Sequence, residues 1–170
     1  KPEEVEKVTI GVLKAGFKVV AAPEEQKRNP KNVVDAQFSM PFGAAVAIIY
    51  GRASLEEYTE DKLDRPDIKE LMSKVQCVQD PALEANYPSQ WPAWAEVETR
   101  DGRRLRSEVK YPKGDPENAL SWDELKDKFR DITRPVFPEQ KLSKQEDIID
   151  IVGSLEELDD VRDLATITGL

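Results

Sequence analysis

The sequence predicts an α+β fold, with a mostly antiparallel four-stranded sheet and helices packed on one face. Three observations support this. Residues 33–53, VVDAQFSMPFGAAVAIIYGRA, are the longest stretch that is apolar on nearly all sides, which indicates a buried central helix. Residues 92–100 and 103–111 flank an Asp-Gly pair, the strongest short signal for a hairpin. Ser-x-x-Glu pairs elsewhere are typical of helix starts.

The chain opens with a strand, because Val8, Ile10 and Val12 alternate with other residues as in a half-buried strand. A proline-bounded polar loop at 23–32 follows, and the central helix then spans about 34–51. Its apolar positions, spaced by three or four residues, are Val34, Phe38, Phe42, Val46 and Ile49. Since Pro41 lacks a backbone donor, the helix either begins near Met40 or kinks there.

Serine–glutamate pairs mark the later helices. In a capping box the serine accepts a hydrogen bond from the third helical amide, while the glutamate accepts one from the cap amide. The pairs are Ser54 with Glu57, Ser121 with Glu124, Ser143 with Glu146 and Ser154 with Glu157. They predict helices near 54–60, 121–132, 143–152 and 154–165, and Pro66 predicts another over 65–73.

The hairpin pattern also predicts its register. A two-residue turn at Asp101-Gly102 would place charged and apolar residues on the same face. A shift of one residue, as in a bulged turn, lets Ala95 and Val97 share a face with Leu105 and Val109. We therefore expect the bulge. Together with the first strand and a short strand at 75–78, the hairpin completes four strands, for which we expect antiparallel pairing after the first.

The composition limits the possible functions. A length of 170 residues suits a single domain. The net charge of −9 argues against binding to nucleic acid or an anionic membrane, and no apolar run reaches the ~20 residues of a membrane span. Residues 138–170 carry nine acidic and three basic side chains. This segment is either a solvated helical face or an acidic interaction surface.

Little in the sequence indicates catalysis. The chain has no histidine, which removes the commonest general base and nitrogen metal ligand. The lone Cys77 reads as a small core residue and fits a reducing, cytoplasmic location. Metal-ligand spacing, a phosphate loop and a nucleophile elbow are missing from the sequence. We expect no catalytic residue, no metal and no cofactor in this chain.

Four segments taken together resemble a known family. They are DAQFSMPF at 35–42, DGR at 101–103, YPKGDPEN at 111–118 and LEELDDV at 155–161. They resemble the C-terminal domain of the MmgE/PrpD family, which includes 2-methylcitrate dehydratases, cis-aconitate decarboxylases and iminodisuccinate epimerases. The resemblance implies a cofactor-free enzyme acting on small polycarboxylates, typically a homodimer, with an all-helical N-terminal domain and a smaller α+β lid.

The resemblance implies that residues 1–170 form that lid, within a longer chain whose helical domain is absent. Because that domain supplies most acid–base residues in the family, we expect the fragment alone to be inactive. The lysine and histidine that usually open the C-terminal domain have no counterpart here, and Phe42 stands where some members have tyrosine. The substrate would be bound mainly by the missing domain.

The resemblance also suggests a substrate-facing region at the entrance of the central helix. Gln37, Ser39 and Phe42 lie there, and a helix start offers free amides and a positive dipole end to a carboxylate. Alternatively, Ser39 only caps the helix and Phe42 packs in the core. The rival function is a non-catalytic interaction module that uses the acidic C-terminal helices. A long helical segment encoded before Lys1 would favour the enzyme, and a start codon immediately upstream would favour the module.

Overall fold

The computed structural model describes residues 1–135, 137 and 142–169, and they form two compact units, residues 1–119 and 120–170. Each unit is described by itself. The single domain expected over 1–170 stays a prediction.

The first unit is built on one sheet. Its strands are β1 (Val5–Val12), β2 (Val75–Gln79), β3 (Ala93–Thr99) and β4 (Arg104–Val109), in the spatial order β2-β1-β3-β4. The β1–β3 and β3–β4 pairs are antiparallel, so the predicted α+β class is confirmed. The pairing expected for β2 was wrong, because β2 runs parallel to β1. The long helical connection between these two strands permits parallel pairing, which a short hairpin does not.

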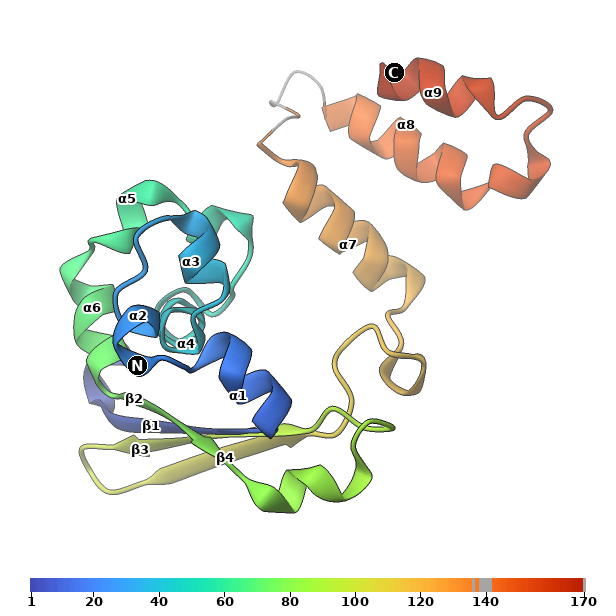
Figure 1. The fold of residues 1–170 in the computed structure, drawn as a ribbon. Helices are drawn as coiled ribbons and strands as arrows, with labels where there is room; N and C mark the ends of the chain where they lie inside the picture. The colour runs from blue at the N-terminus through green and yellow to red at the C-terminus, as the bar shows by residue number, and fades with distance from the viewer. Residues whose placement is uncertain (136, 138–141, 170) are drawn as a thin grey trace. The chain divides into compact units, whose positions relative to one another are not determined.

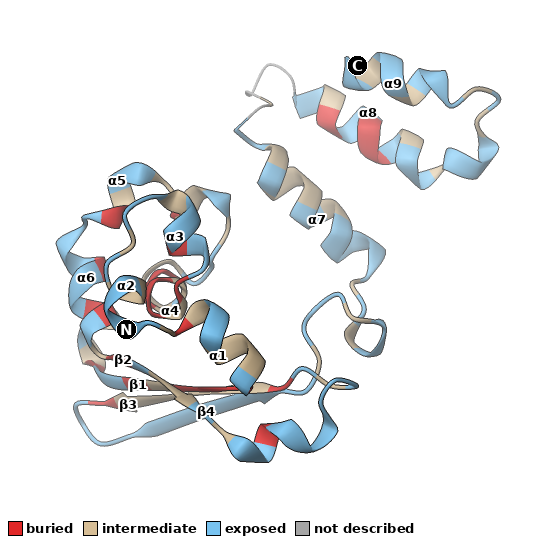
Figure 2. Ribbon diagram, viewed as in Figure 1, coloured by how far each residue is buried: buried red, intermediate tan, exposed pale blue. Residues whose placement is uncertain are grey.

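Helices cover one face of this sheet (Figure 1). They are α1 (Lys14–Val20), α2 (Glu24–Lys27), α3 (Val33–Gln37), α4 (Met40–Tyr50), α5 (Glu60–Leu63) and α6 (Pro66–Ser73). The unit also contains the short 3₁₀ helices η1 (Pro2–Glu4), η2 (Leu55–Glu57), η3 (Pro81–Asn86) and η4 (Pro116–Asn118). The core lies between α4, α6 and the sheet, where Phe42, Val46, Ile68, Val8 and Val75 are almost fully buried (Figure 2). This apolar burial is the main stabilising term of the unit.

The central helix expected at about 34–51 is two helices, α3 and α4. Ser39 has extended backbone angles (φ −113°, ψ 106°) and caps α4, so the chain changes direction there and Pro41 falls in the first turn. This agrees with the alternative that the helix begins near Met40. Because the helix itself is interrupted between Gln37 and Met40, Val34 and Phe38 are 60% and 50% exposed, and the prediction that they are buried was wrong.

The predicted bulged hairpin is confirmed. Val97 lies opposite Leu105, one residue away from the register of a two-residue turn. The amide of Gly102 donates to the carbonyl of Thr99 (2.8 Å), and the amide of Thr99 donates to the carbonyl of Arg103 (2.9 Å). Gly102 has a φ of 83°, the left-handed conformation that this three-residue turn requires.

Two of the four expected capping boxes form. Ser54 begins η2, which is shorter than the helix predicted over 54–60, and Ser121 begins α7 (Trp122–Thr133). Ser143 lies inside α8 (Leu142–Gly153). The hydroxyl of Ser154 instead donates to the carbonyl of Asp150 (2.9 Å), four residues back. Such back-bonding competes with capping, and the helix expected over 154–165 is replaced by two shorter helices, η6 (Leu155–Glu157) and α9 (Arg162–Thr168).

The second unit is helical. Its elements are α7 (Trp122–Thr133), α8 (Leu142–Gly153), η6 (Leu155–Glu157) and α9 (Arg162–Thr168). The guanidinium of Arg130 on α7 donates through Nε and Nη2 to the two carboxylate oxygens of Glu146 on α8, both at 2.7 Å. The buried amide of Gln145 donates to the hydroxyl of Thr133 (2.6 Å). In the described parts of both units, no helix is long and apolar enough to cross a membrane.

Candidate functional site

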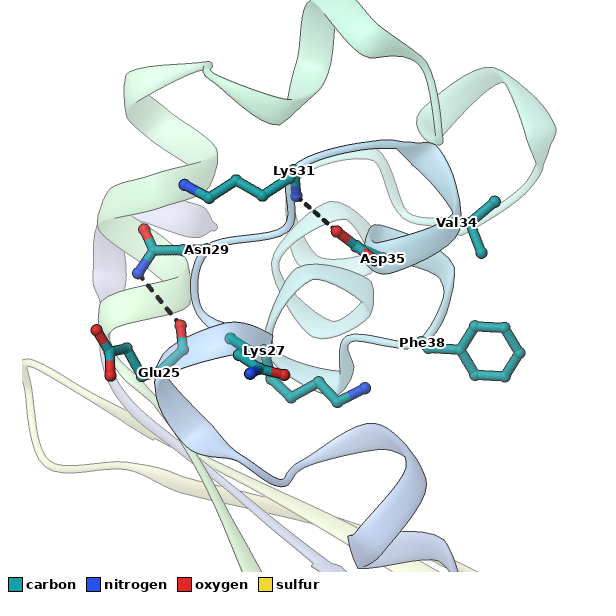
Figure 3. A pocket seen from close by; sticks show the side chains of 8 residues that line it. Glu25, Lys27, Asn29, Lys31, Val34, Asp35 and Phe38 are labelled. Atoms are coloured by element: carbon teal, nitrogen blue, oxygen red, sulfur yellow. Dashed lines mark hydrogen bonds between the residues drawn. The ribbon is translucent and has the colours of Figure 1, made fainter.

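A surface pocket of about 770 Å³ lies beside the α2–α3 loop. Its lining combines charged, amide and apolar side chains: Glu25, Gln26, Lys27, Asn29, Lys31, Val34, Asp35 and Phe38. Figure 3 shows Val34 and Phe38 projecting at one side, while the side chain of Lys31 extends toward Asn29. Val34 and Phe38, which lie outside the core beside the break between α3 and α4, therefore form one wall of this pocket.

The pocket is lined by two acidic and two basic side chains, Glu25, Asp35, Lys27 and Lys31. One carboxylate oxygen of Asp35 accepts hydrogen bonds from the Lys31 amide (3.0 Å) and from the Asn32 side chain (3.2 Å). The carboxylate of Glu25 and the ammonium groups of Lys27 and Lys31 form no ion pair with any described residue, although Lys31 is among the charges that lower the pKa of Asp64. An ammonium group can bind a carboxylate of a small molecule, although the Lys31 side chain extends away from the wall formed by Val34 and Phe38 (Figure 3).

The three residues predicted to contact substrate have different environments. Gln37 is exposed at the end of α3. Ser39 is 3% exposed; its hydroxyl accepts from the Phe42 amide (3.1 Å) and donates to the carbonyl of Lys27. Phe42 is fully buried, with its ring centroid 5.4 Å from that of Tyr58. The structure therefore brings Ser39 and Phe42 together as packing and capping groups, and leaves Gln37 facing solvent.

The start of α4 offers few free donors. The Phe42 amide is bound to the Ser39 side chain, Pro41 has no N–H, and the Gly43 amide donates to the Ser39 carbonyl (2.9 Å). The expected use of these amides for a carboxylate is therefore largely pre-empted by the cap itself. An anion in the pocket would have to be bound by the lysine side chains, because the amides at the start of α4 already have partners.

The sequence-based reasoning missed Lys27 and Lys31. The signal that could have found them is the basic cluster inside the proline-bounded loop at 23–32. The third cation there, Arg28, has a structural role: its guanidinium donates to the carbonyls of Met72 and Val75, both at 2.5 Å. This bridge holds the loop against the end of α6 and the start of β2, and so positions the two lysines.

The other notable ionisable groups of the first unit are structural. Burial raises the pKa of the Cys77 thiol to about 11, which disfavours the nucleophilic thiolate. Burial, with a smaller effect of Glu57, also raises the pKa of Tyr58. The carboxylate of Glu57 is 3% exposed but is held by Arg52 (3.0 Å) and the Ser54 amide (2.9 Å).

A second cavity, of about 290 Å³, lies in the helical unit between α7 and α8. Its lining is almost entirely apolar: Trp122, Leu125, Phe129, Ile132, Ile148, Ile149 and Val152, with Lys126 and Lys128. It offers packing surface and no acid–base pair. In neither unit do the described residues include three or more His, Cys, Asp or Glu side chains grouped to hold a metal.

The fold and the pocket define the class of protein first: an α+β domain with a surface pocket that is lined by two lysines and two acidic residues. The family follows from comparison. The family model of the MmgE/PrpD C-terminal domain matches residues 1–155, and the chain belongs to this family.

Three named proteins are similar in sequence to this chain. The cis-aconitate decarboxylase-like protein oryM of Aspergillus oryzae is 30% identical over 87% of this chain, which spans 29% of that protein. The mitochondrial 2-methylcitrate dehydratase of Yarrowia lipolytica is 25% identical over 84% of this chain and 28% of its own length. Human cis-aconitate decarboxylase is 28% identical over 81% of this chain, again 28% of its length. The chain thus spans less than a third of these relatives.

Proposed function

We propose that this chain is the C-terminal lid domain of a cofactor-free lyase or epimerase that acts on small polycarboxylates. Family membership supports the class, because the matched relatives are named as dehydratases and decarboxylases of such acids. The observation that carries the proposal in this chain is the pocket with Lys27 and Lys31. Two ammonium groups supply charge for a substrate with more than one carboxylate.

Proton transfer is assigned to the rest of the enzyme. Abstraction of a proton next to a carboxylate needs a positioned base and a group that stabilises the developing charge. The chain has no histidine, and its buried carboxylate, Glu57, is already bound to Arg52. In this proposal the lid binds and encloses the substrate, and the isolated 170 residues have no turnover.

The proposal is tested in the full-length protein against a polycarboxylate panel that includes 2-methylcitrate and cis-aconitate. Lys27→Met and Lys31→Met should each raise KM by about tenfold, the usual cost of losing one charge-assisted hydrogen bond, with little change in thermal midpoint. Lys18→Met on α1 is the matched control, because Lys18 is exposed and does not line the pocket. Unchanged KM in both pocket variants would remove the pocket from the substrate site, and turnover by the isolated chain would contradict the lid assignment.

A further inference from the structure

Tyr87 and Trp91 form an exposed aromatic pair in the segment that joins η3 to β3. Their ring centroids are 5.3 Å apart, and the ring planes are inclined at 67°. The two side chains are 41% and 44% exposed, whereas Leu83 and Pro92 on either side of the pair are buried. We call Tyr87 and Trp91 the aromatic corner. Exposed tyrosine and tryptophan side chains are enriched in binding surfaces, because each combines a large apolar ring with a polar group.

The segment that carries the aromatic corner is fixed to the rest of the first unit. The carboxylate of Glu84 on η3 accepts from the backbone amide of Lys14 at the start of α1 (2.6 Å). The backbone amide of Gln90 donates to the carbonyl of Asn86 (2.9 Å) and closes the turn between the two rings. A Cβ added to Gly16 on α1 would lie 4.0 Å from Nε1 of Trp91, so the indole lies beside that helix. A ligand would therefore meet rings that are already ordered.

The free polar groups of the aromatic corner are mainly hydrogen-bond donors. Nε1 of Trp91 and the hydroxyl of Tyr87 form no hydrogen bond with any described residue. The hydroxyl oxygen of Tyr111 accepts from the side-chain amide of Gln90, the residue before Trp91, at 3.1 Å. Its own proton therefore stays available to donate. A ligand for this surface needs hydrogen-bond acceptors beside an apolar group.

We propose that the aromatic corner binds a proline-rich segment of a partner protein in the polyproline II conformation. A proline ring is rigid and apolar, and such segments dock on surfaces lined by aromatic side chains. Their backbone carbonyls make no internal hydrogen bonds, and proline has no N–H, so the segment offers acceptors to Trp91, Tyr87 and Tyr111. Because this conformation is preformed, little chain entropy is lost on binding. The inference concerns the first unit alone and does not rest on the proposed function.

A sugar is the other kind of ligand that stacks on aromatic rings. Each sugar hydroxyl donates a hydrogen bond as well as accepting one, so a sugar site needs free acceptor oxygens. The side-chain oxygen of Gln90 already accepts from the amide of Asn86 (3.3 Å), and Oε1 of Glu84 accepts from the amide of Lys14. The hydrogen-bonding groups therefore favour the proline-rich segment over a sugar.

The indole N–H signals in a nitrogen–proton correlation spectrum of the 170-residue chain test this binding. The chain has three tryptophans, Trp91, Trp94 and Trp122. A polyproline peptide of about ten residues, roughly three turns of the helix, should shift the Trp91 signal because its N–H gains an acceptor. The Trp94 signal is the internal control, since its N–H already donates to Asp80 (2.7 Å). A glycine–serine peptide of equal length should shift neither signal.

The same titration can refute the proposal. A Trp91 signal that does not move with polyproline at about 5 mM would exclude binding even with a Kd of ~1 mM. Movement of the Trp122 signal in its place would put the peptide on the second unit. A Trp91 shift with a linear glucose hexasaccharide, without a shift with polyproline, would make the aromatic corner a sugar site.

Substitutions separate the two rings from their polar groups. Trp91→Ala and Tyr87→Ala should each weaken peptide binding by about tenfold or more, because each removes one ring of the corner. Trp91→Phe keeps a ring and removes the N–H, so it should weaken binding by about threefold to tenfold. Leu105→Ala is the matched control, because Leu105 is an apolar side chain that is 58% exposed and lies on β4. Equal losses in all these variants, or no loss in the two alanine variants of the corner, would overturn the proposal.

The full-length protein supplies the final comparison. Fluorescence anisotropy of a labelled polyproline peptide should give the same affinity for the full-length protein as for the 170-residue chain. Binding that is lost in the full-length protein would show that other parts of that protein cover the aromatic corner, and the proposal would then be wrong.

Discussion

At the scale of single residues, burial decides which predicted site residues can bind a ligand. Ser39 and Phe42 share a motif with Gln37, yet the first two are enclosed and only the third faces solvent. The sequence could predict that Ser39 caps a helix, because the residue type and position are typical of a cap. It could not show that the hydroxyl also bonds the carbonyl of Lys27, a contact that depends on how α2 packs.

Ser39→Ala should therefore reduce the free energy of unfolding by about 1 to 2 kcal/mol, since it removes a cap and leaves the Lys27 carbonyl without that donor. Gln37→Ala should change it by less than about 0.5 kcal/mol, as expected for an exposed side chain. Urea denaturation of both variants gives the comparison. If Ser39→Ala is as stable as the parent chain, the serine is not a structural cap and becomes available as a ligand group.

Gly11 is a second residue whose role the structure makes specific. It is the second-last residue of β1, opposite Trp94 on β3, and a Cβ added there would come within 2.1 Å of the indole ring. Gly11→Ala should cost about 2 to 3 kcal/mol, because the ring must leave its place over the strand and lose the hydrogen bond from Nε1 to Asp80 (2.7 Å).

Gly16→Ala is the matched control for this substitution. Gly16 lies in the helix α1, where an added Cβ meets only the Trp91 side chain at 4.0 Å. Because alanine has the higher helix propensity, this change should stabilise the chain by about 0.5 to 1 kcal/mol. Thermal unfolding of the two variants should therefore shift in opposite directions. A shift in the same direction would show that the ring contact at Gly11 is easily relieved.

At the scale of elements, the register of the hairpin was predictable, whereas the start of the central helix near Met40 was predicted only as one of two alternatives. The register of β3 and β4 follows from local alternation around one turn, and a one-residue slip would misplace every side chain. The break between α3 and α4 is different. The three-to-four spacing of Val34, Phe38 and Phe42 continues across it, so periodicity alone could not show that Phe38 leaves the core for the wall of the pocket. The parallel pairing of β2 likewise depends on the path of the helices between the strands.

The turn itself gives a test at this scale. Gly102 has a φ of 83°, and a Cβ added to it would meet no other atom within 4 Å, so substitution there acts only through backbone strain. Gly102→Ala should destabilise the first unit by about 1 to 2 kcal/mol, and Gly102→Asn by less, because asparagine tolerates the left-handed region. Guanidinium denaturation measures both. Equal losses for alanine and asparagine would mean that the cost is not conformational.

At the scale of the whole molecule, the family and the fold class are established, and the chain spans less than a third of the length of its named relatives. The first unit contributes a pocket and the aromatic corner, and the second contributes an apolar cavity. The sequence could identify the family because each of the family motifs lies within one short segment of the chain. The pocket lysines could not be recognised as a pair, because Lys27 and Lys31 share a surface only once Arg28 has fixed the loop.

The position of β1 between β2 and β3 has a consequence for biosynthesis. Both strands that pair with β1 lie later in the chain. The buried face and both edges of β1 therefore stay uncovered until Thr99 has left the ribosome. At about 5 to 20 residues per second this takes several seconds, during which the nascent chain exposes an aggregation-prone strand. A chain that stops after Gln79 should therefore aggregate, whereas one that continues through Ala119 should stay in the supernatant after centrifugation. Translation that stalls between these two points would make the nascent protein a client for chaperones that bind exposed strands.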